Sequence, residues 1–411
     1  MALRFTPGVQ SQPVFVTGMG VVSAAGATVG AVWDRIATGQ PVVEPVRHFD
    51  IRGCECHVAA QVAEESILPS PARARWPRYV RLAHTALDAA LTQAGLRGAA
   101  NRCLDPAMPM WCSTTGGGTE YGEICISRAR AGGRSGIISS AMRYQARYLP
   151  HALQETYGLH GAAVTLSNAC ASGADLIGTA ASLIASGRAE RIAAGGTESL
   201  STLLFHGFSC LRAMSPTTCR PFSVSRDGLW LGEGAAYLIL ESETAVIRRK
   251  ATPLARLAGY GQSTDLHHLT HPHPQGIALQ RALHQALAQA NVAPEEVAYV
   301  NSHGTATPAN DEAEAHAYES VFGGHLPAVG ISSIKNITGH TLGAAGAIEA
   351  VMTIEALRRH APLPALAVAD PLPNLAASLV RSRESRANGR AFVSCNSGFG
   401  GANAALVFLP A

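Results

Sequence analysis

Cys170 lies where a short apolar segment gives way to small residues, within the stretch from Ala162 to Ser186. Residues 163–166 are apolar or β-branched and carry no charge, which predicts a strand buried on both faces. Ser172 and Gly173 interrupt that pattern, and small and apolar residues follow at helical spacing. Because the N-terminus of a helix favours negative charge, we expect the Cys170 thiol to ionise readily and to act as a nucleophile.

Two histidines in the second half of the chain stand on loops that follow predicted strands. His303 belongs to NSHGTATPAND (301–311), and His340 shares SSIKNITGHTLGAAGAIE (332–349) with Lys335; a third loop, NSGFGGAN (396–403), is dense in glycine. Two imidazole N–H groups facing one cysteine could stabilise an enolate, and glycine-loop N–H groups could stabilise an acyl oxyanion. This set predicts acyl transfer with carbon–carbon bond formation rather than proteolysis, for which one histidine suffices.

The elements that must position these residues alternate between strands and helices, and the series occurs twice with a break near residue 250. Such alternation predicts parallel strands covered by helices on both faces. We expect two similar α/β halves, 1–250 with the nucleophile and 251–411 with the two histidines, and a site in the crevice between their strand ends. Residues 119–160, rich in Arg and Tyr, are expected to form a lid or a dimer-contact insertion.

The composition is typical of a globular protein and indicates where it is found. With 47% hydrophobic and 15% charged residues in 411, the chain can bury a large core, and its net charge of +3 gives no reason to expect nucleic acid. Nine cysteines without framework spacing indicate a reducing compartment. Neither a signal-peptide pattern nor an apolar stretch of spanning length is present, so we expect a cytoplasmic protein with no membrane span.

Taken together, the motifs resemble those of the β-ketoacyl-acyl carrier protein synthases of the elongating, synthase II type, in the thiolase superfamily. The resemblance runs from about Val14 to Leu409. It rests on SNACASG (167–173), RDGLWLGEGAA (226–236) and the three loops quoted above. It implies the thiolase fold, with duplicated halves in a five-layered αβαβα sandwich, and a dimer.

By position, the resemblance implies a role for each motif residue. Cys170 would accept the acyl chain, and His303 and His340 would bind the malonyl thioester and promote its decarboxylation. Lys335 would order the site through an ion pair with Glu349. The remaining assignments are Phe399 as the gating residue, its N–H and that of Cys170 as the oxyanion hole, and Thr305, Thr307, Gly400 and Gly401 as substrate-binding positions.

The implied reaction is a decarboxylative Claisen condensation in fatty-acid-type or polyene/polyketide-type chain elongation. Its substrates are carried on the phosphopantetheine of an acyl carrier protein, and no other cofactor is implied. Residues 219–222 (CRPF) and 229–233 (LWLGE) resemble synthases of aryl polyene and other type II polyene pathways, which pair with a chain-length-factor subunit. A homodimer and a heterodimer with such a paralogue therefore both remain open.

Two other functions remain as alternatives. A non-catalytic scaffold subunit, like a chain-length factor, would lack the nucleophile that Cys170 provides. A biosynthetic thiolase would use a second cysteine as a base, but Cys395 is interpreted as a strand residue.

Several other stretches carry weaker signals. Arg73, Arg75 and Arg78 form either a solvated face or a docking surface for an acidic carrier protein. Cys54–His57 predicts an alternating strand rather than a zinc site, because no second ligand pair follows at zinc spacing. The histidines between residues 267 and 273 could bind a metal, but two prolines and a short loop favour a segment at the lip of the site. The turn at residues 114–118 lacks a nucleotide-binding glycine pattern.

Overall fold

Two sets of five strands with the same order form the framework of the protein. The computed structural model describes residues 12–68, 76–133, 135–365, 368–380 and 389–411. The first set has the order β5-β4-β6-β7-β1 and the second the order β10-β9-β11-β12-β8. The strands of the first set are β1 (Val14–Ser23), β4 (Met110–Ser113), β5 (Ala163–Leu166), β6 (Arg191–Glu198) and β7 (Gly234–Ser242). Those of the second set are β8 (Ala255–Thr264), β9 (Val297–Asn301), β10 (Gly330–Ser332), β11 (Ala391–Gly398) and β12 (Ala402–Leu409).

The strand directions repeat as well as the order. In the first set β7 runs antiparallel to both β1 and β6, and β4 runs parallel to β6 and β5. In the second set β12 runs antiparallel to β8 and β11, and β9 runs parallel to β11 and β10. The sets join where Phe15 of β1 pairs with Arg256 of β8. The fold is thus duplicated, whereas the predicted domain boundary at residue 250 stays a prediction.

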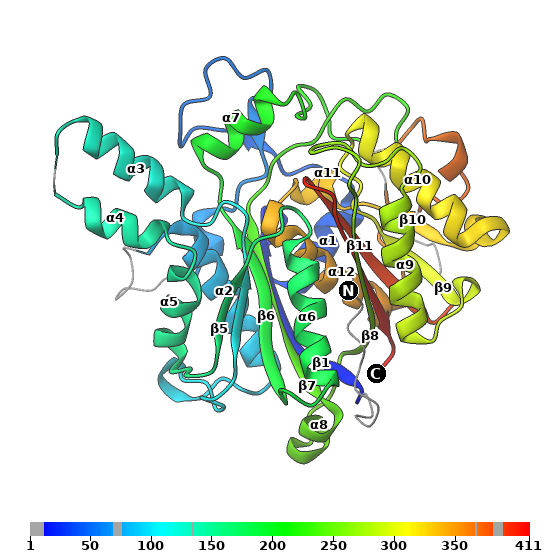
Figure 1. Ribbon diagram of the computed structural model, residues 1–411, viewed down its shortest axis with the longest axis horizontal. Helices are drawn as coiled ribbons and strands as arrows, with labels where there is room; N and C mark the ends of the chain where they lie inside the picture. The colour runs from blue at the N-terminus through cyan, green and yellow to red at the C-terminus, as the bar shows by residue number, and fades with distance from the viewer. Residues whose placement is uncertain (1–11, 69–75, 134, 366–367, 381–388) are drawn as a thin grey trace.

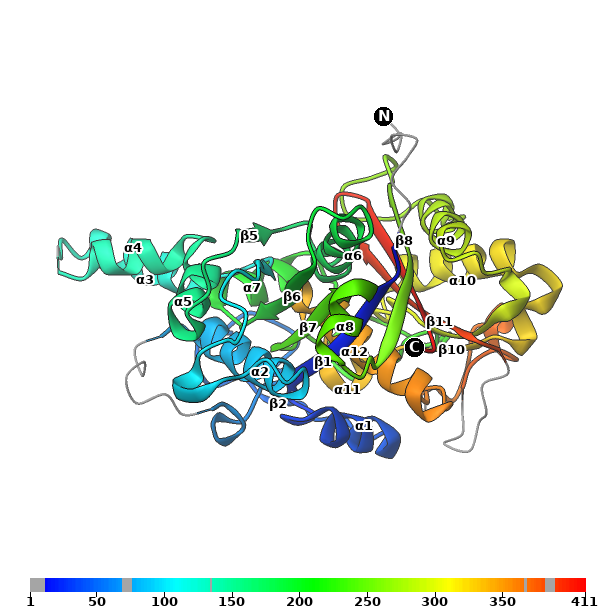
Figure 2. The ribbon, with the colours of Figure 1, turned by 90° about the horizontal axis from the view of Figure 1, so that it is seen from below.

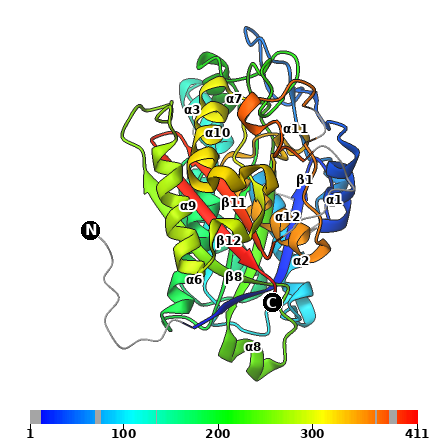
Figure 3. The ribbon, with the colours of Figure 1, turned by 90° about the vertical axis from the view of Figure 1, so that its right-hand side faces the viewer.

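Helices fill the space between the two sets and cover both outer faces. Helices α6 (Ser172–Ala185) and α12 (Ala345–Arg359) pack against strands of both sets, as Figure 1 shows for α6 between β6 and β8. Helices α2 (Arg78–Gln93) and α5 (Tyr148–Tyr157) cover the first set, and α9 (Ile277–Ala290) and α10 (Pro308–Phe322) lie outside the second (Figures 2 and 3). The result is the five-layered αβαβα sandwich of the thiolase-like fold.

The central layer is mostly apolar because little of it faces solvent. Most residues of α6 and nearly all of α12 are buried, and they share one core with β1, β7 and β12. A helix that is apolar all round is stable only in such a position. The amino-terminal ends of these two helices therefore have fixed places, and both lead into the loops that carry the predicted chemistry.

Most of the remaining elements lie at the periphery, but α11 (Lys335–Thr338) is buried. Helices α3 (Thr119–Arg130) and α4 (Ile137–Tyr144) form an arm that projects from the body (Figures 1 and 2). The others are α1 (Val29–Thr38), β2 (Glu44–Pro45), β3 (Val58–Ala59), α7 (Thr202–Cys210), α8 (Glu243–Arg249) and α11 (Lys335–Thr338). None of the helices in the described part of the chain combines the length and hydrophobicity needed to cross a bilayer.

One expectation about the nucleophile strand is wrong. β5 is not buried on both faces; it lies at the outer edge of the first set, paired with β4, and its residues are half-buried or exposed. An apolar run of four residues cannot distinguish a central strand from an edge strand, because periodicity reports burial of side chains and not the number of neighbouring strands.

Candidate active site

Cys170 occupies a sharp turn between β5 and α6. Ala169 has φ of +46°, in the left-handed region, and the turn is closed by hydrogen bonds from the N–H groups of Ala171 and Ser172 to the carbonyls of Asn168 and Ala169, both 3.2 Å. A non-glycine residue in this region is uncommon and is found where the surroundings hold a strained backbone. The turn presents the Cys170 side chain at the start of the central layer.

Small residues let the two central helices approach each other closely at this point. A Cβ atom on Gly173 would lie 2.6 Å from the Ala347 nitrogen, and one on Gly346 would lie 2.4 Å from the Ala174 nitrogen. Any side chain at either position would push the helices apart. This contact brings the loop before α12, which carries His340, next to the turn that carries Cys170.

The structure brings Cys170, His303 and His340 together. The Sγ atom of Cys170 lies 3.0 Å from Nε2 of His340, and the rings of His303 and His340 meet edge to face with centroids 5.2 Å apart. His303 follows β9, and His340 is held by backbone bonds to Trp230 (2.7 Å) and Gly232 (3.0 Å) of the RDGLWLGEGAA motif. All three side chains of the set are almost completely buried.

Burial sets the protonation state of this group. It raises the pKa of the Cys170 thiol to about 12, although the Lys335 charge and the Phe399 N–H oppose this. Burial and then the Lys335 charge hold the pKa of both histidines well below the usual value. The expectation that Cys170 ionises readily is therefore wrong: burial favours a thiol, which lies beside neutral imidazoles.

Lys335 joins the histidine loops to the central layer. Its Nζ donates hydrogen bonds to the His303 carbonyl and to Glu349, with which it forms a buried ion pair. The other oxygen of Glu349 accepts from Nδ2 of Asn396 at 2.6 Å. This is the ion pair that the family resemblance implied for Lys335 and Glu349. That it orders the site stays a prediction.

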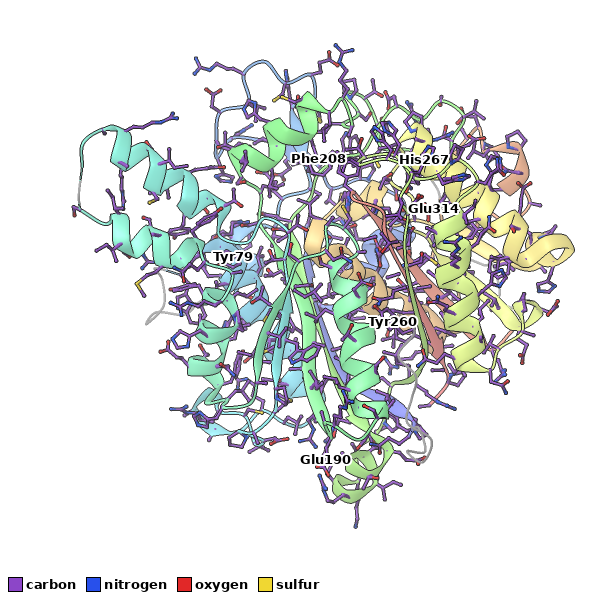
Figure 4. All side chains as sticks on the ribbon, in the orientation of Figure 1. Tyr79, Glu190, Phe208, Tyr260, His267 and Glu314 are labelled. Atoms are coloured by element: carbon purple, nitrogen blue, oxygen red, sulfur yellow. The ribbon has the colours of Figure 1, made fainter. Side chains whose placement is uncertain are left out.

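A cavity of about 240 Å³ opens onto the Cys170 side chain. Phe399 lies at its wall, with its ring stacked on Phe208 of α7 (centroids 5.7 Å apart), and Phe208 also meets the His340 ring edge to face. Figure 4 places Phe208, His267 and Glu314 in the same upper part of the molecule. Phe208 was not found from the sequence, because an apolar residue on a helix carries no signal of what it contacts.

Three of the four predicted substrate-binding positions line this cavity. Thr305, Thr307 and Gly401 line it, and the hydroxyls of the two threonines lie 2.8 Å apart. Gly400 does not line it but donates its N–H to the carbonyl of Leu269 at 2.7 Å, which fixes the loop to the segment after β8. Their roles toward substrate stay predictions.

Two buried carboxylates on α10 shape the His303 loop and were missed as functional residues. Glu314 accepts the N–H groups of His303 (2.9 Å) and Gly304 (2.6 Å), and Asp311 accepts those of Thr305 (3.0 Å) and Ala306 (3.1 Å). Burial raises the pKa of Glu314 to about 7. Their spacing of three residues, one face of a helix that starts directly after the loop, was the available signal.

The predicted docking arginines divide into two groups. Arg73 and Arg75 lie outside the described residues. The Arg78 guanidinium bonds to Glu233 (2.6 Å) and Glu64 (2.9 Å) and to the carbonyl of Val62. Docking by Arg78 stays a prediction, and its guanidinium already has three partners within the chain.

The histidine-rich segment after β8 lies at the mouth of the cavity. His268 and His271 line it, with their Nδ1 atoms 3.1 Å apart. Among the described residues, the one group of three or more metal-ligand side chains is Cys170, His303 and His340 itself.

Comparisons with known proteins agree with this geometry. Family models described as "Beta-ketoacyl synthase, N-terminal domain" and "Beta-ketoacyl synthase, C-terminal domain" match residues 11–245 and 254–368. A 3-oxoacyl-[acyl-carrier-protein] synthase 2 of Coxiella burnetii is 32% identical, over 97% of this chain and 98% of its own.

Two solved structures are similar over nearly the whole chain. The ishigamide ketosynthase/chain length factor has a TM-score of 0.89 and 27% identity, covering 98% of this chain and 100% of its own. A ketosynthase in complex with its chain length factor from Xenorhabdus doucetiae has a TM-score of 0.82 and 27% identity, covering 99% and 100%.

Proposed function

The chain belongs to the β-ketoacyl synthase family and is an acyltransferase-type enzyme, and we propose that it condenses an acyl group on Cys170 with a malonyl group on an acyl carrier protein. The observation that carries the proposal is the contact of the Cys170 thiol with the neutral His340 imidazole at 3.0 Å, with His303 packed against that imidazole. A nucleophile, a proton acceptor and a second N–H donor are the parts that the two half-reactions need.

In the first half-reaction, Cys170 takes the acyl chain from a carrier-protein thioester. His340 Nε2 accepts the thiol proton while Sγ attacks the thioester carbonyl, so that no free thiolate forms before the attack. The N–H groups of Cys170 and Phe399 stabilise the oxyanion that forms. When the intermediate collapses, the carrier thiolate leaves and takes back the proton from His340.

In the second half-reaction, malonyl-carrier protein enters the same cavity. After the carrier thiol has left, His340 passes to the tautomer with its proton on Nε2 by exchange with solvent. The N–H groups of His303 and His340 then bind the malonyl thioester oxygen, and loss of CO₂ leaves an enolate stabilised by these donors. The enolate carbon attacks the acyl-Cys170 carbonyl, and collapse of the tetrahedral intermediate expels the Cys170 thiolate, which takes a proton from solvent. Neutral imidazoles suit this step, because each must donate a hydrogen bond and not give up its proton.

The substrates arrive on the phosphopantetheine arm of the carrier protein. The cavity at Cys170 supports this, since its lining combines apolar side chains with the hydroxyls of Thr305 and Thr307, which can bond to the amides of the arm. We keep both fatty-acid-type and polyene/polyketide-type elongation as pathways. All nine cysteines are free, which fits the reducing cytoplasm in which we place the reaction.

A second chain is the expected structural partner. The outer edge of β5 and the exposed apolar side chains of the arm, Ile126, Ile138, Met142 and Tyr144, support a subunit interface on this side. A copy of this chain gives a homodimer, and a chain-length-factor paralogue gives a heterodimer. Light scattering of the purified chain, alone and after co-expression with such a paralogue, separates the two.

The scaffold alternative is favoured only by the chain length factor in the names of the structural relatives. Intact-protein mass spectrometry after incubation with a series of acyl-carrier proteins tests it, followed by peptide mapping. An acyl mass gain on Cys170 supports the enzyme, and Cys170→Ala must abolish it. If no acyl chain adds to Cys170, with or without the partner subunit, the enzyme proposal fails and the scaffold function replaces it.

A further inference from the structure

A buried carboxylate at the end of β6 has no part in the steps above. Glu198 is completely buried, yet its two oxygens accept five hydrogen bonds. Four come from backbone N–H groups and one from a hydroxyl: Thr115 N (2.7 Å), Gly116 N (3.0 Å), Gly117 N (3.1 Å), Gly343 N (3.1 Å) and Thr114 Oγ1 (3.1 Å). A carboxylate can satisfy so many donors only when ionised.

These donors belong to two segments that lead directly to the reacting groups. Thr115 bonds through its own hydroxyl to the carbonyl of Ala169, at 3.1 Å, which is the residue before the nucleophile. Gly343 lies three residues after His340, on the loop that enters α12. One side chain thus links the Cys170 turn and the His340 loop, although they are far apart in sequence.

The two segments are packed tightly against each other at this junction. A Cβ atom on Gly343 would lie 2.4 Å from the Thr115 nitrogen, so the two backbones touch where both bond to Glu198. Ser113 reinforces the junction by donating its hydroxyl to the Gly343 carbonyl at 2.9 Å. The two segments can keep this close approach only if the N–H groups facing each other share an acceptor.

We propose that Glu198 is a positioning residue for the condensation, which fixes the Cys170 turn and the His340 loop to each other through one buried carboxylate. The inference rests on the proposed function, because the distance it maintains is that between Sγ and Nε2. Glu198 touches neither the substrate nor the reacting atoms, and acts through Thr115 and Gly343.

The negative charge on Glu198 also has an effect that opposes the reaction. Its negative charge contributes to the raised pKa of Cys170, so it opposes formation of the thiolate. Burial raises the pKa of Glu198 itself to about 7, and the N–H donors limit this rise. Geometry and charge can therefore be separated: a shorter acid keeps the charge and loses contacts, and an amide of equal length loses the charge.

The test compares three substitutions in the full-length protein, with its partner subunit if one is needed. Glu198→Asp keeps the charge, Glu198→Gln removes it, and Glu190→Gln is the matched control. Glu190 is exposed and paired with Arg248, and it directly precedes β6, whose last residue is Glu198; Figure 4 shows it at the lower edge of the molecule. Condensation is measured with acyl- and malonyl-carrier protein, and Cys170 alkylation by iodoacetamide at pH 8, each well below the variant's thermal midpoint.

We expect condensation to fall roughly tenfold or more in both Glu198 variants, the effect of losing charge-assisted hydrogen bonds. Alkylation should be unchanged in Glu198→Asp but roughly threefold faster in Glu198→Gln, because a thiol pKa lower by about half a unit gives more thiolate. A purely structural role would not raise thiol reactivity in one variant alone. Glu190→Gln should match the wild-type protein in both assays.

A fourth variant leaves Glu198 in place, so that the inference can be tested even if the Glu198 variants do not fold. Thr115→Val keeps the Thr115 N–H but removes its hydroxyl from the Ala169 carbonyl, and we expect acyl transfer to slow severalfold while malonyl decarboxylation is unchanged. Wild-type condensation in all of these variants would overturn the inference and leave the proposed function intact. If the wild-type protein condenses nothing, the proposed function fails, and equal alkylation rates in all Glu198 variants would then overturn the inference separately.

Discussion

Removal of the Lys335 charge should make the stability of the protein depend strongly on pH. Lys335 and Glu349 are both almost completely buried, and within the described part of the chain their ion pair is the one direct charge contact that either makes. Lys335→Met keeps the length of the side chain but leaves the carboxylate of Glu349 in an apolar layer. Asn396 then remains as its hydrogen-bond partner at 2.6 Å.

The size of the stability loss follows from the Glu349 charge, which stays buried when Lys335 is replaced. Breaking a buried ion pair by removing one partner costs about 3–5 kcal/mol, because the other charge loses its compensation. The pKa of Glu349 is already raised by burial, with Lys335 opposing that rise, so the substitution must raise it further. Each additional unit is worth about 1.4 kcal/mol, so two to three units account for the expected loss.

The sign of the pH dependence is fixed by this direction. A carboxyl group whose pKa is higher in the folded protein destabilises the fold as pH rises above the unfolded value, until the folded pKa is reached. The loss in Lys335→Met should therefore be smallest near pH 5, where Glu349 is protonated, and largest near pH 8. Glu349→Gln in the same chain should recover most of the loss at pH 8, because it removes the uncompensated charge.

Thermal unfolding of the wild-type protein, Lys335→Met and the double variant, at pH 5 and pH 8 and one scan rate, measures these differences. The double-mutant comparison isolates the pair, since the two residues are in direct contact. The reasoning is refuted if Lys335→Met loses the same stability at both pH values. It is equally refuted if the double variant is less stable than Lys335→Met at pH 8.

Three further substitutions test other parts of the site. His303→Ala should retain acyl transfer but lose condensation by about 100-fold or more, because a donor to the enolate is removed; single-turnover mass spectrometry separates the two steps, and full product formation would exclude the role. Phe208→Ala, which removes the ring stacked on Phe399, should cost about 3 kcal/mol in a denaturant titration; an unchanged midpoint would show that the stack contributes little. Arg78→Ala leaves Glu233 buried and should lower stability by about 2 kcal/mol, and a raised KM for the carrier protein without this loss would instead favour docking.

The sequence predicted the reacting residues better than the residues that hold them. Cys170 and His303 were found because nucleophile and imidazole side chains directly follow predicted strands, and strand ends meet at one edge of a sheet. The duplicated α/β series was visible because strand and helix periods alternate twice. Glu198, by contrast, has no signal in the sequence, because four of its five hydrogen-bond donors are backbone N–H groups and any sequence can supply those.

The protonation state of Cys170 shows why local sequence arguments fail at such a site. The turn before α6 was expected to favour a thiolate, and the turn is where it was expected. The same small residues that form it also let α6 and α12 close around the sulfur, and the resulting burial raises its pKa to about 12. Activation must then come from a group that is distant in sequence, and His340 at 3.0 Å provides it. A thiol that His340 activates only when the substrate is bound is protected from other electrophiles. The burial that opposes ionisation of Cys170 therefore also makes the thiol selective for its substrate.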